Sequence, residues 1–225
     1  MMGVNDTVRP GGRKLRFGGL RQIGALVLLA MFVLNAPSAR AARPDADAAQ
    51  AFIGGLADDA SKALRGEGSL SEREAKLRSL LRKGFAIDLI AQVALGKHWR
   101  RVSATERDDY TTEFGEFLLR TYASRLGGFD REAFEVGEAV ARGKRDVIVQ
   151  TRIRQAGNAP AIKAGWRIRQ VNGELRIIDI VVEGVSMVLN QRQEFAQIVR
   201  TRGMSALIEM LRARTQRAPI EGPKD

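Results

Sequence analysis

The stretch at residues 162–195 reads IKAGWRIRQVNGELRIIDIVVEGVSMVLNQRQEF. Apolar and polar residues alternate along most of it, which is typical of strands that bury one face. Asn172-Gly173 and Gly184 interrupt the alternation, and these residues favour turns and bends. The pattern predicts two long antiparallel strands, a bend at Gly184 and a third extended segment that runs into a helix.

The apolar positions of the two long strands predict which side chains share a face. The candidates for the inward face all carry even numbers: Ile162, Ala164, Trp166, Ile168, Ile178, Ile180 and Val182. Because side chains change faces at each residue, a two-residue turn would pair Trp166 with Asp179 and mix the faces. A three-residue loop at residues 171–173 would instead pair Trp166 with Ile178. We therefore expect the three-residue loop, with Gly173 at positive φ.

Beyond Gly184 the apolar residues change parity. Val185, Met187 and Leu189 carry odd numbers, and a one-residue bulge at Glu183-Gly184 would keep them on the same face of the sheet. The sheet should bend at this point. Its apolar concave face is then either part of a packed core or the wall of a container.

Residues 1–41 have the pattern of an export signal. Basic residues precede an apolar run at residues 23–34, and Ala39-Arg40-Ala41 follows in the form of a cleavage site. The run is short for a membrane span, although an uncleaved anchor is the alternative. We expect cleavage after Ala41, a single domain over residues 42–216 and a disordered polar tail at residues 217–225.

The chain carries a formal net charge of +11 at pH 7. Residues 1–41 hold six of the 37 basic and one of the 26 acidic residues, so the mature chain keeps 31 and 25 and its charge falls to +6. This surplus is spread along the chain, whereas nucleic-acid-binding modules concentrate it in a stripe, and we expect no nucleic-acid partner. The chain has no cysteine, and an exported protein without disulfides fits the bacterial periplasm.

Helical spacing of apolar residues predicts four helices before the strands. They cover residues 45–64, residues 71–84 with a capping box at Ser71, residues 88–95, and residues 103–126 with a second box at Ser103. From Phe134 the period changes to two, which gives about four strands in all, and two helices close the chain on either side of Gly203. Helices followed by strands predict an α+β fold, in which helices cover one face of a bent antiparallel sheet.

No set of residues indicates catalysis. His98 is the only histidine, and we expect it at the surface or at a helix end. The sequence has no nucleophile elbow, phosphate loop or metal-ligand cluster. We therefore expect a protein that is not an enzyme and that uses no cofactor and no metal.

Four segments resemble the MlaC or toluene-tolerance (Ttg2) family. They are LLRKGFAI at residues 80–87, ALGKHWR at 94–100, EFGEFLLRTY at 113–122 and DIVVEGVSM at 179–187. The last segment, followed by Arg192 and Phe195, is the most specific, and the resemblance covers about residues 45–212. It implies an NTF2-like fold in which helices close an apolar cavity over the bent sheet.

The resemblance also implies a function. Members of this family are periplasmic phospholipid carriers that move lipid between an outer-membrane lipoprotein complex and an inner-membrane ABC transporter, and so maintain outer-membrane asymmetry. We expect the same partners here, a diacyl phospholipid as ligand, and a monomer. A hopanoid-associated branch of the same family is an alternative source of the ligand.

A lipid carrier needs an enclosed apolar cavity. A two-chain lipid contains some thirty methylenes, and at about 0.8 kcal/mol each their exposure to water costs on the order of 20 kcal/mol or more. The candidates for contacting lipid come from the concave sheet face, the aromatic helix and their neighbours. Arg192 is expected either beside the phosphate or in a salt bridge to Glu183. The candidates are Phe85, Ile90, Val93, Trp99, Phe114, Phe117, Leu118, Tyr122, Val149, Ile153, Trp166, Ile168, Ile178, Ile180, Val182, Val185, Met187 and Arg192. The alternative is that these apolar residues pack against one another as a core.

Two other classes of function stay open on the sequence. An NTF2-like isomerase would need a small closed pocket with paired polar groups, such as Tyr122 bound to a buried carboxylate. A periplasmic adaptor that binds only proteins would have a filled core and an exposed apolar patch.

Overall fold

The computed structural model describes residues 43–65, 69–125, 133–154 and 160–217, all within one compact unit, Ala41–Asp225. The predicted export signal at residues 1–41 and the chain after residue 217 lie outside the described residues, so cleavage after Ala41 stays a prediction. In the described ranges, no helix combines the length and apolarity that a bilayer crossing requires.

The helices and strands follow one another as the sequence predicts. The helices are α2 (Ala46–Arg65), α3 (Leu70–Gly84), α4 (Ile87–Leu95), the short 3-10 helix η1 (Gly96–Arg100), α5 (Ala104–Arg125) and α6 (Met187–Arg217). The strands are β1 (Phe134–Arg142), β2 (Asp146–Ile153), β3 (Ile162–Val171), β4 (Glu174–Val182) and β5 (Val185–Ser186), and they form one antiparallel sheet in the order β1-β2-β3-β4-β5. The predicted α+β class is confirmed, with a two-residue fifth strand in addition to the four expected.

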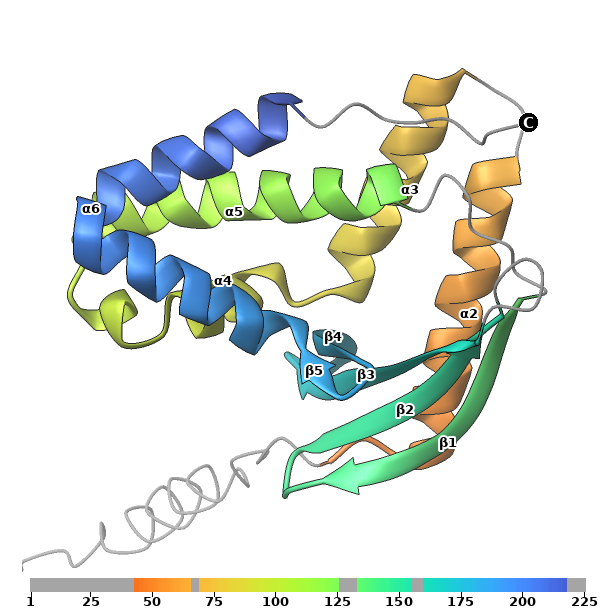
Figure 1. Cartoon of the computed structure of the whole chain (residues 1–225). Helices are drawn as coiled ribbons and strands as arrows, with labels where there is room; N and C mark the ends of the chain where they lie inside the picture. The colour runs from red at the N-terminus through yellow and green to blue at the C-terminus, as the bar shows by residue number, and fades with distance from the viewer. Residues whose placement is uncertain (1–42, 66–68, 126–132, 155–159, 218–225) are drawn as a thin grey trace, which may run out of the picture. The chain divides into compact units, whose positions relative to one another are not determined.

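The helices gather over one face of the sheet (Figure 1). Helix α2 contacts β1 and β2, α3 contacts α2, α5 and β4, and α4 and α6 contact each other and β4. Helix α6 is broken at Gly203, whose φ of 86° and ψ of 175° are not helical, and it turns back there beside α5 (Figure 1). The predicted break between the two closing helices is thus confirmed at Gly203.

Two capping boxes start helices, one of them at a different serine from the one predicted. At α5, the Ser103 hydroxyl accepts from the Glu106 N–H, and the Glu106 carboxylate accepts from the Ser103 N–H, as expected. At α3 the box is Ser69 with Glu72, so the prediction of Ser71 is wrong. Both serines precede a glutamate by the right kind of spacing, but Ser69 has the extended backbone that an N-cap requires.

The turn between β3 and β4 has two residues, so the predicted three-residue loop is wrong. Val171 pairs with Glu174, and Asn172 and Gly173 occupy the turn with φ of 52° and 85°, the mirror-image turn that an Asn-Gly pair favours. Positive φ at Gly173 is confirmed.

The extra residue that the parity argument required lies in β4 instead. The register shifts between Arg167 and Ile168, so that Trp166 pairs with Ile180 and Ile168 with Ile177. Ile178 is the bulged residue, and the predicted pairing of Trp166 with Ile178 is wrong. Ile177 joins the core in its place, while Ile178 is buried outside that core cluster of the described residues.

Glu183 and Gly184 also form a two-residue turn rather than a bulge. Val182 pairs with Val185 across it, and both turn residues have positive φ, at 47° and 82°. The chain therefore folds back into β5, and Val185 and Leu189 are 53 % and 52 % exposed rather than on the concave face.

Candidate functional site

Two small apolar pockets lie between the sheet and the helices. Pocket A has a volume of about 50 Å³ and is lined by Phe85, Ile90, Ala94, Phe114, Phe117, Leu118, Asp179, Ile180, Met187, Val188 and Gln191. Pocket B has a volume of about 110 Å³ and is lined by Ile53, Leu56, Ala57, Ala60, Leu77, Leu80, Leu81, Phe85, Phe134, Trp166, Ile177 and Ile180. Helices α4, α5 and α6 form the walls of pocket A, and α2 and α3 form those of pocket B.

Phe85 and Ile180 line both pockets and therefore form the wall between them. Phe85 follows α3, where its N–H donates to the Leu81 carbonyl at 2.9 Å, and the next N–H, of Ala86, donates to the Ile177 carbonyl at 3.0 Å. These bonds tie the segment to β4. The backbone at Phe85 is thus held in place, and the side chains of Phe85 and Ile180 stand between the two spaces.

Few polar groups border the pockets, and those that do are hydrogen-bonded. Asp179 is 7 % exposed, and its carboxylate accepts from the Ser186 hydroxyl at 2.6 Å and from the Val188 N–H at 3.1 Å. The carboxylate thereby satisfies an N–H in the first turn of α6.

The concave face also holds a hydroxyl, so the expectation that it is wholly apolar is wrong. Thr151 is buried on it, donates to the Ala164 carbonyl at 3.0 Å, and accepts from the Trp166 ring N–H at 2.9 Å. This pair of bonds satisfies the indole N–H beside pocket B, as a buried tryptophan requires. The remaining surface of Trp166 that faces the pocket is apolar.

The structure divides the predicted site residues into three groups. Those that line a pocket are Phe85, Ile90, Phe114, Phe117, Leu118, Trp166, Ile180 and Met187. Those that pack in or against the core without lining either pocket are Val149, Ile153, Ile168 and Val182. The remaining residues, Val93, Trp99, Ile178, Val185 and Arg192, also line neither pocket, although Trp99 packs against the edge of the core. The side chain of Tyr122 lies outside the described residues.

The structure shows the environment of three residues that line neither pocket, namely Val93, Trp99 and Arg192. Val93 is 38 % exposed on α4. Trp99 lies under the Arg107 guanidinium, 4.9 Å from its ring centre, and borders a polar surface groove that also includes Asp88 and Glu116. Cation–π stacking at the surface explains this tryptophan without a ligand.

Arg192 is exposed and lies over the end of α4. A Cβ on Gly96 would come within 2.4 Å of the Arg192 Nε, so the guanidinium rests on the glycine where α4 ends. A cation at a helix C-terminus is favoured by the helix dipole. The suggested salt bridge to Glu183 is absent among the described residues, since Glu183 accepts instead from the Lys163 N–H at 2.6 Å.

The lining of pocket B from α2 and α3 is absent from the predicted set. The residues concerned are Ile53, Leu56, Ala57, Ala60, Leu77, Leu80 and Leu81. Their helical apolar stripes were visible in the sequence, but such stripes are typical of a core and do not indicate where packing leaves space. A sequence signal that could have found them is the set of alanines in α2, because Ala49, Ala57 and Ala63 leave the buried face of that helix with small side chains.

Three comparisons place these features among known proteins. The family model described as MlaC protein matches residues 54–213. The intermembrane phospholipid transport system binding protein MlaC of Haemophilus influenzae is 26 % identical over 139 residues, which is 59 % of this chain and 65 % of that protein's length. A phospholipid-binding protein from Ralstonia solanacearum, solved in complex with a phospholipid, superposes with a TM-score of 0.63 at 19 % identity and covers 76 % of this chain and 98 % of its own.

The three comparisons support different conclusions about this chain. The solved structure supports the α+β fold alone, because its identity to this chain is low, and the Haemophilus protein is aligned over just under two thirds of its length. The family match spans most of the described domain and includes every residue that lines the two pockets except Ile53. The chain belongs to the MlaC family.

Proposed function

We propose that this chain is a periplasmic carrier that holds the acyl chains of a phospholipid in pockets A and B. The observation that carries the proposal is the pair of apolar pockets that share the Phe85 and Ile180 wall between the sheet and the helices. A diacyl lipid has two chains to shelter, and each pocket offers an almost purely apolar lining. The printed names of the Haemophilus relative and of the Ralstonia protein support the same ligand class.

The volumes of the pockets imply that loading requires the protein to open. Ligand pockets for molecules of moderate size have volumes of roughly 300 Å³ or more, and both pockets are much smaller. The conformation described is therefore a closed one in which the apolar lining packs against itself. An empty enlarged cavity would expose that lining or leave it without contacts, so closure in the absence of lipid is the expected response.

Rotation of the Phe85 side chain is the smallest movement that would connect the two pockets. Its backbone is bonded to α3 and β4, so the ring can move without breaking a strand or a helix. Separation of α2 and α3 from α5 would widen the joined space further. Both movements leave the backbone hydrogen bonds of the sheet intact.

The wider role follows from the family. We propose that the exported chain exchanges lipid with an outer-membrane complex and an inner-membrane ABC transporter and acts as a monomer. The name of the Haemophilus relative, which refers to an intermembrane phospholipid transport system, supports this role. Whether the ligand is a phospholipid or a hopanoid is decided by identifying what the protein binds.

The test is native mass spectrometry with lipid extraction on protein purified without detergent. We expect about one diacyl lipid per chain. Ile180→Asp places a charge in the wall of both pockets, where it lacks a partner, and should abolish lipid retention. Leu189→Asp is the matched control, because Leu189 is exposed and lines neither pocket, and it should retain lipid.

Circular dichroism must first establish that both variants are folded. A folded wild-type monomer that carries no lipid, and takes none up from anionic vesicles, would contradict the carrier function. That outcome would favour a protein-only adaptor whose core is filled by its own side chains.

A further inference from the structure

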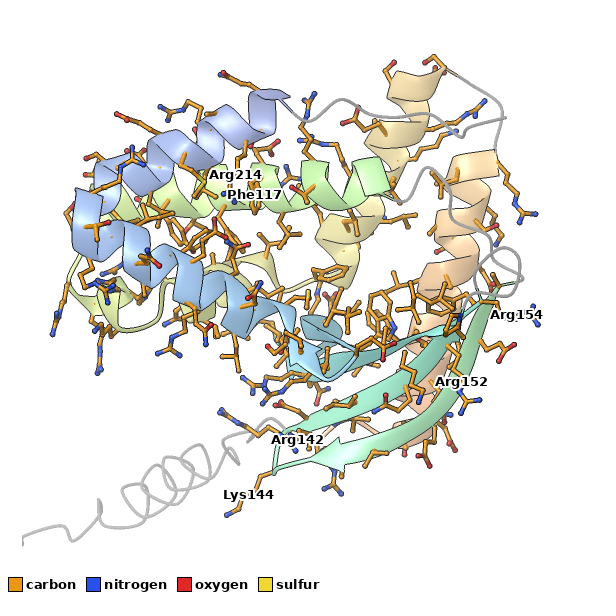
Figure 2. The ribbon with its side chains drawn as sticks, in the orientation of Figure 1. Phe117, Arg142, Lys144, Arg152, Arg154 and Arg214 are labelled. Atoms are coloured by element: carbon orange, nitrogen blue, oxygen red, sulfur yellow. The ribbon has the colours of Figure 1, made fainter. Side chains whose placement is uncertain are left out.

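The β1–β2 turn carries three cations within four residues at the end of the sheet. Arg142, Lys144 and Arg145 surround Gly143 and are all exposed. Figure 2 shows Arg142 and Lys144 at this turn, projecting away from the helices. Among the described residues, none of the three has an ion-pair or hydrogen-bond partner, so their charges face solvent.

Two further arginines lie beside the turn and are held in fixed orientations by one carboxylate. Asp146 pairs with Arg142 on one side and with Arg169 on the other, so their side chains share the outer face of the sheet. Arg169 donates to Asp146 from Nε at 2.6 Å and from Nη2 at 3.0 Å. Arg167 donates to the same carboxylate from Nε at 2.8 Å and from Nη2 at 2.5 Å.

These bonds leave one edge of each guanidinium available. Within the described part of the chain, the Nη1 group of neither Arg167 nor Arg169 has a hydrogen-bond partner. A guanidinium whose orientation is fixed loses little freedom when it binds a phosphate oxygen. The pair is therefore an oriented set of donors for phosphate, next to three more mobile cations.

The net positive charge of the outer face is concentrated at this end. At the other end, the cross-strand row of Glu135, Arg152, Lys163 and Glu183 contains two cations and two carboxylates. At the turn, the Asp146 carboxylate is engaged by Arg167 and Arg169, whereas Arg142, Lys144 and Arg145 are exposed. Val140, in β1 next to the cations, is 47 % exposed.

We propose that this surface, formed by Val140, Arg142, Lys144, Arg145, Arg167 and Arg169 and here named the basic hairpin surface, binds the face of an anionic phospholipid bilayer. A bilayer can bind both kinds of side chain on this surface. Its phosphates attract the cations, and the apolar boundary below them can accept the exposed valine. An acidic protein would match the charges but gives no role to Val140. The surface lies on the opposite face of the sheet from pockets A and B, so its binding does not depend on lipid in the pockets.

The test is co-sedimentation with vesicles of phosphatidylcholine alone and of phosphatidylcholine mixed with phosphatidylglycerol. The wild-type chain should bind only the mixed vesicles, and raised salt should weaken the binding because exposed charges are screened. The triple variant Arg142→Gln, Lys144→Gln, Arg145→Gln should lower the partition coefficient by on the order of a hundredfold, since each cation near such a surface contributes a factor of about five to that coefficient.

A matched control removes the same charge elsewhere. Lys97, Arg100 and Arg101 are three exposed cations in and after η1, and their change to glutamine should leave most of the vesicle binding intact. An equal loss of vesicle binding in both triple variants would mean that net charge alone determines the binding, and it would overturn the proposal. So would a wild-type chain that binds neither kind of vesicle at low salt. Co-purified lipid is measured in the same samples. A loss of vesicle binding with unchanged lipid content concerns the basic hairpin surface, whereas a loss of lipid content concerns the carrier function.

Discussion

Phe85 separates two pockets that a single ligand with two chains would need to fill. Its ring is almost fully buried and contributes to both linings, while its backbone is fixed by bonds to α3 and β4. The residue thus has a packing role in the closed conformation and a gating role in the proposed open one. Substitution can separate these two roles.

Phe85→Ala should destabilise the lipid-free protein by about 3 kcal/mol, because it removes a buried ring and leaves a cavity. The same change joins pockets A and B, so added phospholipid should recover more stability in this variant than in the wild type. Denaturant unfolding with and without lipid measures both effects. Phe195→Ala is the control, because Phe195 is fully buried but lines neither pocket, and an equal recovery there would contradict the gating role.

Asp146 provides a pH-dependent contribution to stability. Burial acts to raise the pKa of this carboxyl, but hydrogen bonds from Arg169 and Arg167 and their charges lower the pKa overall. The folded pKa is thus below the unfolded one, so the stabilisation is fully present above the unfolded pKa of about 3.8 and is lost as the pH falls through the folded pKa.

Asp146→Asn should therefore lower the free energy of unfolding at neutral pH by about 2 kcal/mol. This value lies between those for an exposed and for a fully buried ion pair, because Asp146 is buried but both arginines are partly exposed. Urea unfolding at a series of pH values tests this. The difference between variant and wild type should shrink as the solution becomes more acidic than the unfolded pKa. A difference that stays constant with pH would mean that the carboxylate charge is not the cause.

At the scale of the elements, most of the fold follows from periodicity, and the errors concern local geometry. Parity correctly places Ala164, Trp166 and Ile168 on the core face. It also requires one extra residue between the two strands, but a bulge can lie anywhere along a strand at a modest local cost. The Asn-Gly pair by itself favours a two-residue turn. Because the turn takes only two residues, the extra residue has to lie inside a strand, and it is Ile178 in β4.

The start of α3 offers a direct test of local geometry. Ser69→Ala should cost about 1 kcal/mol, because it removes the acceptor of the Glu72 N–H. Ser71→Ala should be close to neutral, because Ser71 lies inside the first turn and its hydroxyl contacts only that of Ser69 among the described residues. Thermal or denaturant unfolding of the two variants measures the difference. Equal effects would mean that the helix begins elsewhere in solution.

At the scale of the whole molecule, the sequence predicts which residues are apolar better than where they leave space. Seven of the twelve residues that line pocket B come from α2 and α3 and resemble an ordinary core stripe. A cavity is set by the relative positions of elements distant in the chain, so the stripe alone does not reveal it. Val93 and Val185 show the converse error, since both are apolar and exposed. Composition and periodicity do not distinguish a lipid container from a packed core. The family resemblance is what favours the container.

The different surroundings of the two tryptophans have an optical consequence. Trp166 lines pocket B with its ring N–H bonded to Thr151, whereas Trp99 lies beneath Arg107 at a polar groove, and the chain has no other tryptophan. In Trp99→Phe protein the emission of the remaining indole reports on the pocket alone, so phosphatidylcholine with brominated acyl chains should quench it on loading. In Trp166→Phe protein the same lipid should leave the emission of Trp99 almost unchanged. The chain thus contains its own fluorescent indicator of whether it is full or empty, and the rate of filling can be followed in real time without a label.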